Sequence, residues 1–193
     1  MLDKGYAKRI LEEALKLLAG LGPDSKEYRE FAADVLNGLD PYKPYGTNLY
    51  NAIARLSWNM FFEGVALRVN PSTTKIEIYL RKRAADEVYP LEWHAPGSAF
   101  RPGETERDVA NRLEREFGTP IISFRYIGEY VDWKKGEIRG SGVSRIYLVH
   151  CDGSPREDER HDWYPVDQLP ENTVEPHRTG IIPKAIKAYA HRV

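Results

Sequence analysis

Acidic and basic side chains are concentrated in one short segment of the sequence, Glu92–Gly118. Its carboxylates include Glu104 and Glu116, and Mg²⁺ prefers such oxygen ligands, commonly one or two carboxylates completed by phosphates and water. Its arginines include Arg112 and Arg115, and guanidinium groups bind phosphate oxygens through paired hydrogen bonds. The segment therefore contains side chains suited to holding a phosphate group, with or without a divalent cation.

A helix must position these side chains. Two Pro-Gly turns, at 96–97 and 102–103, precede a stretch with an apolar face at helical spacing, made of Val109, Ala110, Leu113 and Phe117. Asp108, Arg112 and Glu116 follow one another at intervals of four on another face. Such pairs stabilise a solvated helix by about 0.2–0.5 kcal/mol each, so the charges also have a purely structural explanation. The spacing predicts a helix over 105–117 that ends at Gly118.

Strand patterns lie on both sides of this helix. Residues 61–69 are apolar enough to be buried, and residues 76–81 alternate as a strand with one buried face does. Further strands are predicted at 120–132 and 143–151, and a last helix at 181–190. Strands interleaved with two principal helices indicate an α/β or α+β sandwich.

The loop and charged helix after a β-hairpin resemble the Nudix hydrolase family. The family's box reads Gly, five residues, Glu, seven residues, Arg-Glu, an aliphatic residue, any residue, Glu-Glu, any residue, Gly. Outside the box, residues 61–83 resemble the family's first hairpin, Trp93 stands just before the box, and His161–Glu171 resembles the segment that leads into the C-terminal helix. These matches cover about residues 58–190. They imply a Nudix-type α/β/α sandwich with a mixed sheet.

The box itself is altered in this sequence. Ser98 stands where a glycine of the box belongs, and Glu104 matches its first glutamate. When the helix is aligned backwards from Gly118, Leu113 takes the aliphatic position and Glu116 the second glutamate of the final pair. In this register arginines at 112 and 115 replace two acids, Asn111 replaces the arginine, and one residue is deleted before the helix.

A second register is open. It keeps Arg112 as the family's arginine, but it places Leu113 and Phe117 on acidic positions and loses the glycine. We prefer the first register because it preserves the apolar face. In both registers Glu116 is the one remaining member of the acidic trio.

The resemblance implies roles for particular residues. Glu116 and Glu104 are the expected catalytic and metal-binding residues, with Mg²⁺ or Mn²⁺ as cofactor if hydrolysis is retained and no metal otherwise. The expected substrate-binding residues are Arg101, Arg112, Arg115, Trp93 and His94. An acid recruited from a later loop would be Glu129, Glu137 or Glu157.

The altered box is a weak cation site on physical grounds. In the family, bound magnesium activates water for attack on phosphorus. A single carboxylate beside two guanidinium groups suits a cation poorly, because like charges about 5 Å apart repel even at an effective dielectric constant near 20. The same arginines attract phosphate.

Composition narrows the class of protein. The chain has 193 residues and a formal net charge of −1, which gives no sign of a nucleic-acid-binding surface. No stretch approaches the roughly 20 apolar residues of a membrane span, and the N-terminus lacks the apolar core of a secretion signal. One cysteine, Cys151, excludes an internal disulfide. We expect a cytoplasmic protein.

Residues 1–45 are predicted to form an N-terminal helical hairpin, and residues 46–193 the Nudix-like domain. Asp24 or Ser25 caps the second of the two helices, and Thr47 begins a short third one. The hairpin has three open roles: it packs on the core, forms a homodimer contact or covers the pocket.

Two functions fit the sequence. The first is hydrolysis of a nucleoside-diphosphate-linked small molecule, that is, cleavage of a phosphoanhydride at an altered metal site. The alternative is a catalytically inactive Nudix-fold module that binds a nucleotide-like ligand or mediates a protein interaction. Both imply a phosphorylated, nucleotide-derived partner.

Overall fold

The computed structural model describes residues 13, 16, 19–22, 25–39, 49, 53, 58–132 and 141–191. The chain divides into two compact units, Met1–Pro44 and Tyr45–Val193. In the first unit, helix α2 spans Lys26–Asn37, and the Ser25 hydroxyl caps it by accepting from the Tyr28 amide. The predicted second helix and one of its two proposed caps are therefore confirmed.

The structure describes only some residues of the other two predicted N-terminal helices. Glu13, Lys16 and residues 19–21 are helical, and the rest of the predicted first helix lies outside the described residues. The same holds for the third helix, of which Leu49 and Ile53 are described and helical. Helix α2 has no buried side chain, and its larger apolar side chains are exposed: Phe31, Val35 and Leu36.

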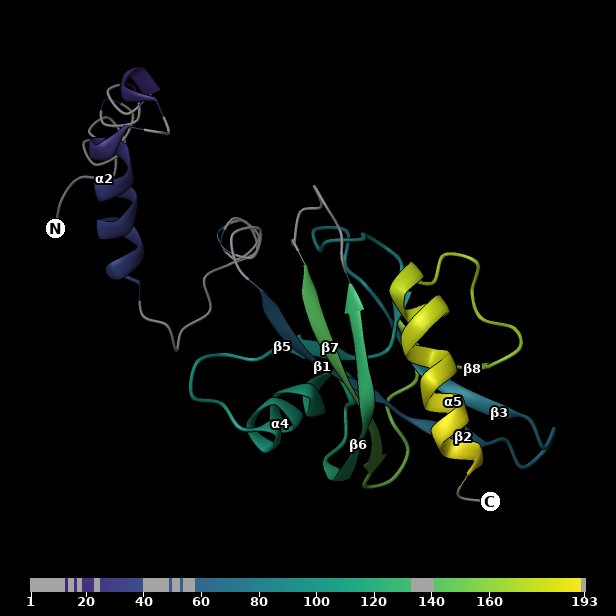
Figure 1. Cartoon of the computed structure of the whole chain (residues 1–193). Helices are drawn as coiled ribbons and strands as arrows, with labels where there is room; N and C mark the ends of the chain where they lie inside the picture. The colour runs from purple at the N-terminus through teal and green to yellow at the C-terminus, as the bar shows by residue number, and fades with distance from the viewer. Residues whose placement is uncertain are drawn as a thin grey trace, which may run out of the picture. The chain divides into compact units, whose positions relative to one another are not determined.

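A mixed four-stranded sheet forms the centre of the second unit, in the order β5-β1-β7-β6 (Figure 1). Its strands are β1 (Asn59–Val65), β5 (Gly97–Ala99), β6 (Ile121–Asp132) and β7 (Gly142–Cys151). Strands β1 and β7 run parallel, whereas β5 and β6 pair antiparallel with their neighbours. The mixed sheet and both late strands were predicted, and they are confirmed.

A second, antiparallel sheet is built around β3 (Ile76–Lys82). Strands β2 (Leu67–Val69) and β4 (Trp93–His94) pair with successive parts of β3, and β8 (His161–Pro165) also pairs with it. This arrangement brings the segments around Trp93 and His161, distant in sequence, to the same central strand.

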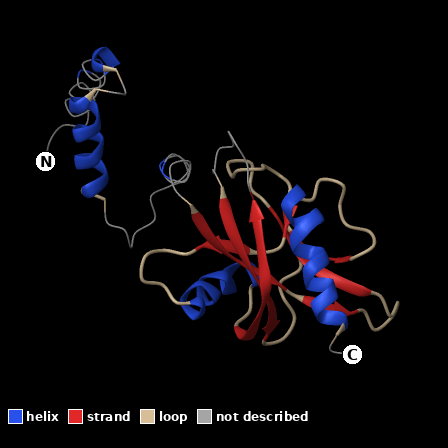
Figure 2. Cartoon of the chain, in the orientation of Figure 1, coloured by secondary structure: helices blue, strands red, loops and turns tan. Residues whose placement is uncertain are grey.

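Helices cover both faces of the mixed sheet (Figure 2). Helix α4 (Glu106–Phe117) packs with Phe62 and Tyr147 on one face. A π-helical turn, η1 (His177–Ile181), leads into α5 (Ile182–Ala190), which packs with Val65 and Ile146 on the other. The predicted α/β/α sandwich is confirmed. None of the described helices is long and apolar enough to cross a membrane.

The prediction that β3 has only one buried face is wrong. Ile78 and Leu80 pack in the core beside α5, but Tyr79 between them is also fully buried, in the core beside α4. The reason is tertiary: the C-terminal end of α4 lies over the second face, where the Tyr79 ring stacks on Phe117 at 5.3 Å between centroids. Strand β3 therefore contributes side chains to both cores, and Tyr79 joins the strand to the end of α4.

Candidate functional site

Helix α4 has well-defined ends. Thr105 and Asp108 form a capping box, in which the Thr105 hydroxyl accepts from the Asp108 amide and the Asp108 carboxylate accepts from the Thr105 amide. Gly118 ends the helix in the left-handed conformation, at φ 71°, which suits glycine. Its apolar face is buried as the first register requires, with Val109, Ala110, Leu113 and Phe117 at most 1 % exposed.

Arg112 does not take part in the expected ladder with Asp108 and Glu116. Its guanidinium donates to both carboxylate oxygens of Glu104, at 2.9 and 2.7 Å, to the Ser98 hydroxyl at 2.6 Å and to the Ala99 carbonyl at 2.8 Å. The Arg112 and Glu104 side chains are only 19 % and 16 % exposed. A half-buried site with several acceptors matches the guanidinium fork better than solvated partners along the helix.

A pocket of about 310 Å³ lies over this face of α4. It is lined by Ser98, Arg112, Leu113, Arg115 and Glu116. The guanidinium of Arg115 has no side-chain partner among the described residues, and Arg115 itself is exposed. Arg112, by contrast, is already held by Glu104. The pocket therefore offers one arginine that can bind a ligand without first breaking an ion pair.

Glu116 is the pocket's carboxylate. Its Oε2 atom is shielded from solvent and has no hydrogen-bond partner in the described structure. Burial raises the pKa of the Glu116 carboxyl, and Glu87 adds to this effect, while the charges of Arg81, Arg83 and Arg112 oppose it. A shielded oxygen without a partner costs stability, so it needs an explanation beyond folding.

Arg81 and Glu87 are neighbours of Glu116 that the sequence analysis missed. Arg81, at the end of β3, binds both oxygens of Glu87, and its Nη1 lies 3.3 Å from Nε2 of His94. Only a fold in which β3 passes beside the end of α4 brings these residues to Glu116. No local pattern in the sequence distinguishes them from other surface charges.

The remaining predicted ligand-binding residues lie elsewhere. Trp93 and His94 are buried on β4, where Trp93 contacts the Tyr164 ring edge-on at 5.0 Å. Burial and the charge of Arg83 lower the pKa of His94. Arg101 contributes its backbone amide to Glu104 Oε2 at 2.8 Å. None of the three lines the pocket, so their ligand roles stay predictions.

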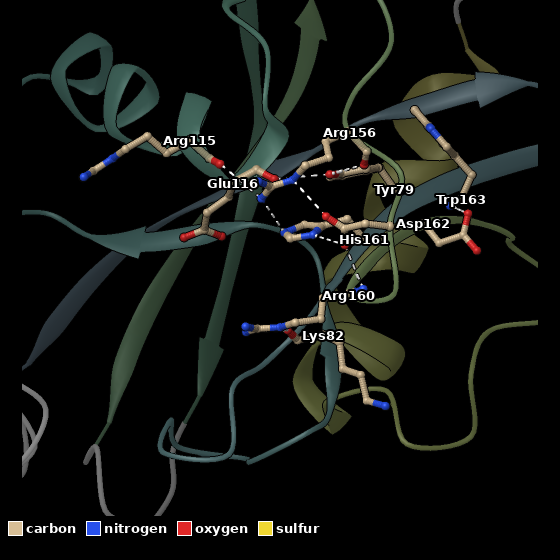
Figure 3. A network of polar contacts seen from close by, with 10 residues as sticks. Tyr79, Lys82, Arg115, Glu116, Arg156, Arg160, His161, Asp162 and Trp163 are labelled. Carbon is tan, nitrogen blue, oxygen red and sulfur yellow. Dashed lines mark hydrogen bonds and ion pairs between the residues drawn. The ribbon is translucent and has the colours of Figure 1, made fainter.

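A network at the C-terminal end of α4 fixes the backbone that carries Arg115 and Glu116 (Figure 3). The Tyr79 hydroxyl lies 3.2 Å from the Glu116 carbonyl and 2.8 Å from the Arg156 carbonyl, and the Arg156 amide donates to Phe117 O at 2.7 Å. In Figure 3 the side chains of Arg115 and Glu116 extend away from these contacts. The network thus holds the helix end without occupying the pocket.

His161 and Asp158 both contact the guanidinium of Arg156, and Figure 3 shows His161 beside it. Arg156 Nη2 donates to His161 Nε2 at 3.0 Å, so the His161 proton resides on Nδ1, which donates to Asp158 Oδ1 at 2.7 Å. Burial, together with the charge of Arg156, lowers the pKa of His161. A neutral His161 is required, because only an unprotonated Nε2 accepts from Arg156.

Replacing Tyr79 by phenylalanine should lower the free energy of unfolding by about 1–2 kcal/mol, because the carbonyls of Glu116 and Arg156 lose the one hydroxyl hydrogen that they share. Denaturant unfolding measures the loss. The control is Tyr164→Phe, which removes a tyrosine hydroxyl from a half-buried residue, and this hydroxyl makes no hydrogen bond in the described structure. Equal losses in the two variants would show that the Tyr79 contacts do not stabilise α4.

The carboxylates that could bind a metal ion do not fit the divalent-metal site that the resemblance implies. Both oxygens of Glu104 are occupied by Arg112. Across the described ranges, no three acidic, histidine or cysteine side chains come together in a way that suits a metal ion. Of the acids considered for recruitment, Glu157 pairs with Arg68 at 3.3 Å, Glu129 lies opposite Arg145 on β7, and Glu137 falls outside the described residues.

Comparison of the sequence finds no match, whereas comparison of the structure finds solved proteins with a similar fold. No protein-family model matches the sequence, and no curated protein is significantly similar to it. A MutT Nudix hydrolase from Burkholderia pseudomallei superposes with a TM-score of 0.53 at 21% identity, over 65% of this chain and 97% of the other. A MutT/Nudix family protein from Listeria innocua gives 0.53 at 18% identity, over 69% and 95%.

The Nudix domain of Shewanella oneidensis NrtR, solved in complex with ADP ribose, superposes with a TM-score of 0.53 at 16% identity. This match covers 81% of the present chain and 97% of the other. Identities this low establish the fold alone. Together with the mixed sheet between α4 and α5, the matches show that this chain has the Nudix fold.

Proposed function

We propose that this Nudix-fold domain binds a phosphorylated, nucleotide-derived small molecule in the pocket over α4. The observation that carries the proposal is the engagement of Glu104 by Arg112, which leaves Glu116 as the only box carboxylate at the pocket. Arg115 then supplies the phosphate contact through its unengaged guanidinium. The complex of the NrtR Nudix domain with ADP ribose supports a ligand of this class.

Titration calorimetry in the presence of a chelator tests the proposal. We expect ADP-ribose and inorganic pyrophosphate to bind without a divalent cation, and Arg115→Ala to weaken each by about tenfold or more, since charge-assisted hydrogen bonds are worth about 1.5–3 kcal/mol. Arg178→Ala is the matched control, because Arg178 is exposed on η1 and does not line the pocket. Equal binding by the two variants would contradict the role of Arg115.

One observation favours hydrolysis as a second function. The carboxyl of Glu116 lines the pocket, and burial raises its pKa, which suits a group that takes a proton from water. Incubation with nucleoside-diphosphate derivatives, with and without Mg²⁺ or Mn²⁺, separates the two functions. Metal-dependent product formation that Glu116→Gln abolishes would establish a hydrolase, whereas tight binding without turnover would establish a binding module.

Exchanging Arg115 for glutamate should raise the affinity for Mg²⁺ or Mn²⁺ by about tenfold, because it places a second carboxylate beside Glu116 and removes a repelling charge. Calorimetric titration of the metal alone measures the change. Arg115→Gln is the control, because it removes the positive charge without adding a ligand. Tight Mg²⁺ binding by the unmodified protein would overturn this account and favour recruitment of Glu129, Glu137 or Glu157.

A further inference from the structure

We propose that Glu87 occupies an anion site formed by Arg81 and Arg83 beside the pocket, and that a second phosphate group of the ligand displaces it. This inference rests on the proposed function, because it takes the first phosphate to bind at Arg115. It adds a second subsite for the ligand and a loop that closes this subsite. The ligand that fits both subsites is a diphosphate.

The carboxylate of Glu87 is held as an external anion would be. Arg81 donates to both of its oxygens, from Nη1 to Oε2 at 3.0 Å and from Nη2 to Oε1 at 2.5 Å. Arg83 Nη1 lies 3.8 Å from the same Oε2. A guanidinium fork matches two phosphate oxygens as well as it matches two carboxylate oxygens. The position that Glu87 fills therefore also suits a phosphate group.

Arg81 keeps a partner that holds it in place when Glu87 leaves. Its Nη1 lies 3.3 Å from His94 Nε2, and because an arginine only donates, this ring nitrogen accepts. Burial, together with the charge of Arg83, lowers the pKa of His94, so the ring is neutral and able to accept at neutral pH. His94 itself is fixed, since it is 2 % exposed and pairs with Arg81 across strands β3 and β4. The guanidinium of Arg81 is thus positioned for an anion independently of Glu87.

Strand β3 places Arg81 next to the pocket. Tyr79 and Arg81 are two residues apart on this strand, so their side chains extend from the same face of β3. The Tyr79 hydroxyl lies 3.2 Å from the Glu116 carbonyl, and Glu116 lines the pocket. Burial raises the pKa of the Glu116 carboxyl, and the charge of Arg81 is the foremost effect that opposes it. Arg81 therefore lies close to the pocket without lining it while Glu87 is bound.

The loop that carries Glu87 is strained. Residues 83–92 connect β3 to β4 without helix or strand. Tyr89 and Leu91 have φ angles of 56° and 61°, in the left-handed region, which costs free energy for residues other than glycine. Leu91 is also 52 % exposed, so burial of its side chain does not hold its backbone in this conformation. Opening of the loop relieves this strain and thereby offsets part of the loss of the ion pair.

Displacement of Glu87 exchanges one set of contacts for another. Besides the ion pair, opening breaks the hydrogen bond from Arg83 Nη1 to the Val88 carbonyl, at 2.9 Å. It also breaks the bond from Asn172 to the Leu91 carbonyl, at 2.9 Å. The base of the loop stays closed, because the Arg83 amide donates to the Glu92 carbonyl at 2.9 Å where β3 and β4 pair. The arriving phosphate takes over both guanidinium groups, which replaces the broken contacts.

Titration calorimetry with inorganic pyrophosphate, on the full chain and with a chelator, tests the second subsite. Glu87→Gln preserves the size of the side chain but removes the charge that competes with phosphate. We expect it to tighten pyrophosphate binding by about fivefold or more, because a larger share of the protein then has Arg81 accessible. Adding Arg81→Gln should cancel this gain. A gain that survives the loss of Arg81 would overturn the assignment of the subsite.

Asp86→Asn is the matched control. It removes the same charge from the preceding position of the loop, where Asp86 is exposed and makes no hydrogen bond or ion pair in the described structure. Its pyrophosphate affinity should stay within about twofold of that of the unmodified protein, because solvent and salt screen an exposed charge. Equal gains in Asp86→Asn and Glu87→Gln would mean that net charge alone raises the affinity, and this result would overturn the displacement of Glu87.

Hydrogen exchange follows the loop in the unmodified protein, so this measurement does not depend on the folding of a variant. The amides of Glu87 and Glu92 donate within the loop, to the carbonyls of Ala84 and Tyr89. Pyrophosphate should speed their exchange as the loop opens, whereas a ligand that leaves the loop closed slows the exchange or leaves it unchanged. Slower or unchanged exchange in residues 84–92 with bound pyrophosphate would contradict the opening of the loop.

Failure of this inference differs from failure of the proposed function. Pyrophosphate binding that depends on Arg115 but is the same in Glu87→Gln as in the unmodified protein would overturn the second subsite and leave the proposed function intact. Absence of Arg115-dependent binding of any phosphate, including inorganic pyrophosphate, would overturn both.

Discussion

Phe117→Ala should lower the free energy of unfolding by about 3–5 kcal/mol, the cost of removing a large buried aromatic side chain. Phe117 is fully buried and stacks on Tyr79, so its loss opens a cavity between the end of α4 and β3. The Tyr79 ring cannot move easily to close this cavity, because its hydroxyl is hydrogen-bonded to the carbonyls of Glu116 and Arg156.

Denaturant unfolding followed by circular dichroism measures this loss. The matched control is Phe31→Ala on α2, where the same atoms are removed from a side chain that is 43 % exposed, and the change should stay within about 0.5 kcal/mol. Phosphate affinity should fall as well, because Phe117 anchors the helix turn that carries Arg115 and Glu116. A Phe117 variant as stable as the Phe31 variant would contradict the packing of α4.

The sequence predicts α4 well because the information that defines it is local. The apolar spacing, the capping residues at 105 and 108 and the glycine at 118 all lie within one segment, and the observed helix, Glu106–Phe117, agrees with the prediction to one residue. Arg112, Arg115 and Glu116 reach the same pocket for the same reason: they lie within five residues on one helix. Such sites are predictable once the helix is.

Partners from distant segments could not be predicted in the same way. Alternation in 76–81 indicates which side chains share a face, but only the packing of α4 and β8 against β3 decides that Tyr79 is buried. Likewise, the i,i+4 spacing makes Asp108 and Glu116 possible ion-pair partners of Arg112. In the fold, Arg112 instead donates hydrogen bonds to Glu104 and Ser98, which lie in a less solvated place. Helical spacing gives candidates, and burial selects among them.

The same distinction applies to the metal site. The sequence shows that two acids of the family's box are replaced, but not that Glu104, which matches the box, is engaged by an arginine. That engagement comes from the turn at 101–104, where the Arg101 amide also donates to Glu104. A residue that matches a motif is therefore free to act only if its neighbours leave its oxygens accessible.

Arg112→Ala should lower the free energy of unfolding by about 2–4 kcal/mol at neutral pH. Removing one partner of a buried ion pair costs about 3–5 kcal/mol, and partial exposure of Arg112 and Glu104 screens part of that cost. The variant also leaves the Ala99 carbonyl and the Ser98 hydroxyl without their donor. Arg115→Ala is the matched control on the same helix, and it should change stability by no more than about 0.5 kcal/mol.

The cost of Arg112→Ala should depend on pH with a definite sign. Burial alone would raise the pKa of Glu104, but hydrogen bonds from Arg112 and the Arg101 amide overcome it and hold the pKa below the ordinary value of 4.5. The native state therefore favours ionised Glu104, and this stabilisation is complete above pH 4.5 and lost as the pH falls through the lower native value. The difference between the unmodified protein and Arg112→Ala should accordingly be largest at neutral pH and shrink in acid.

A double-mutant cycle with Glu104→Gln isolates the pair. If the ion pair carries the effect, the double variant should lose less than the sum of the single losses, with a coupling energy of about 1–3 kcal/mol at neutral pH and less in acid. A coupling energy near zero, or a cost of Arg112→Ala that does not change with pH, would mean that Arg112 stabilises the fold through Ser98 and Ala99 alone. Glu104 would then be available to a cation, and the argument against a metal at this pocket would lose its main support.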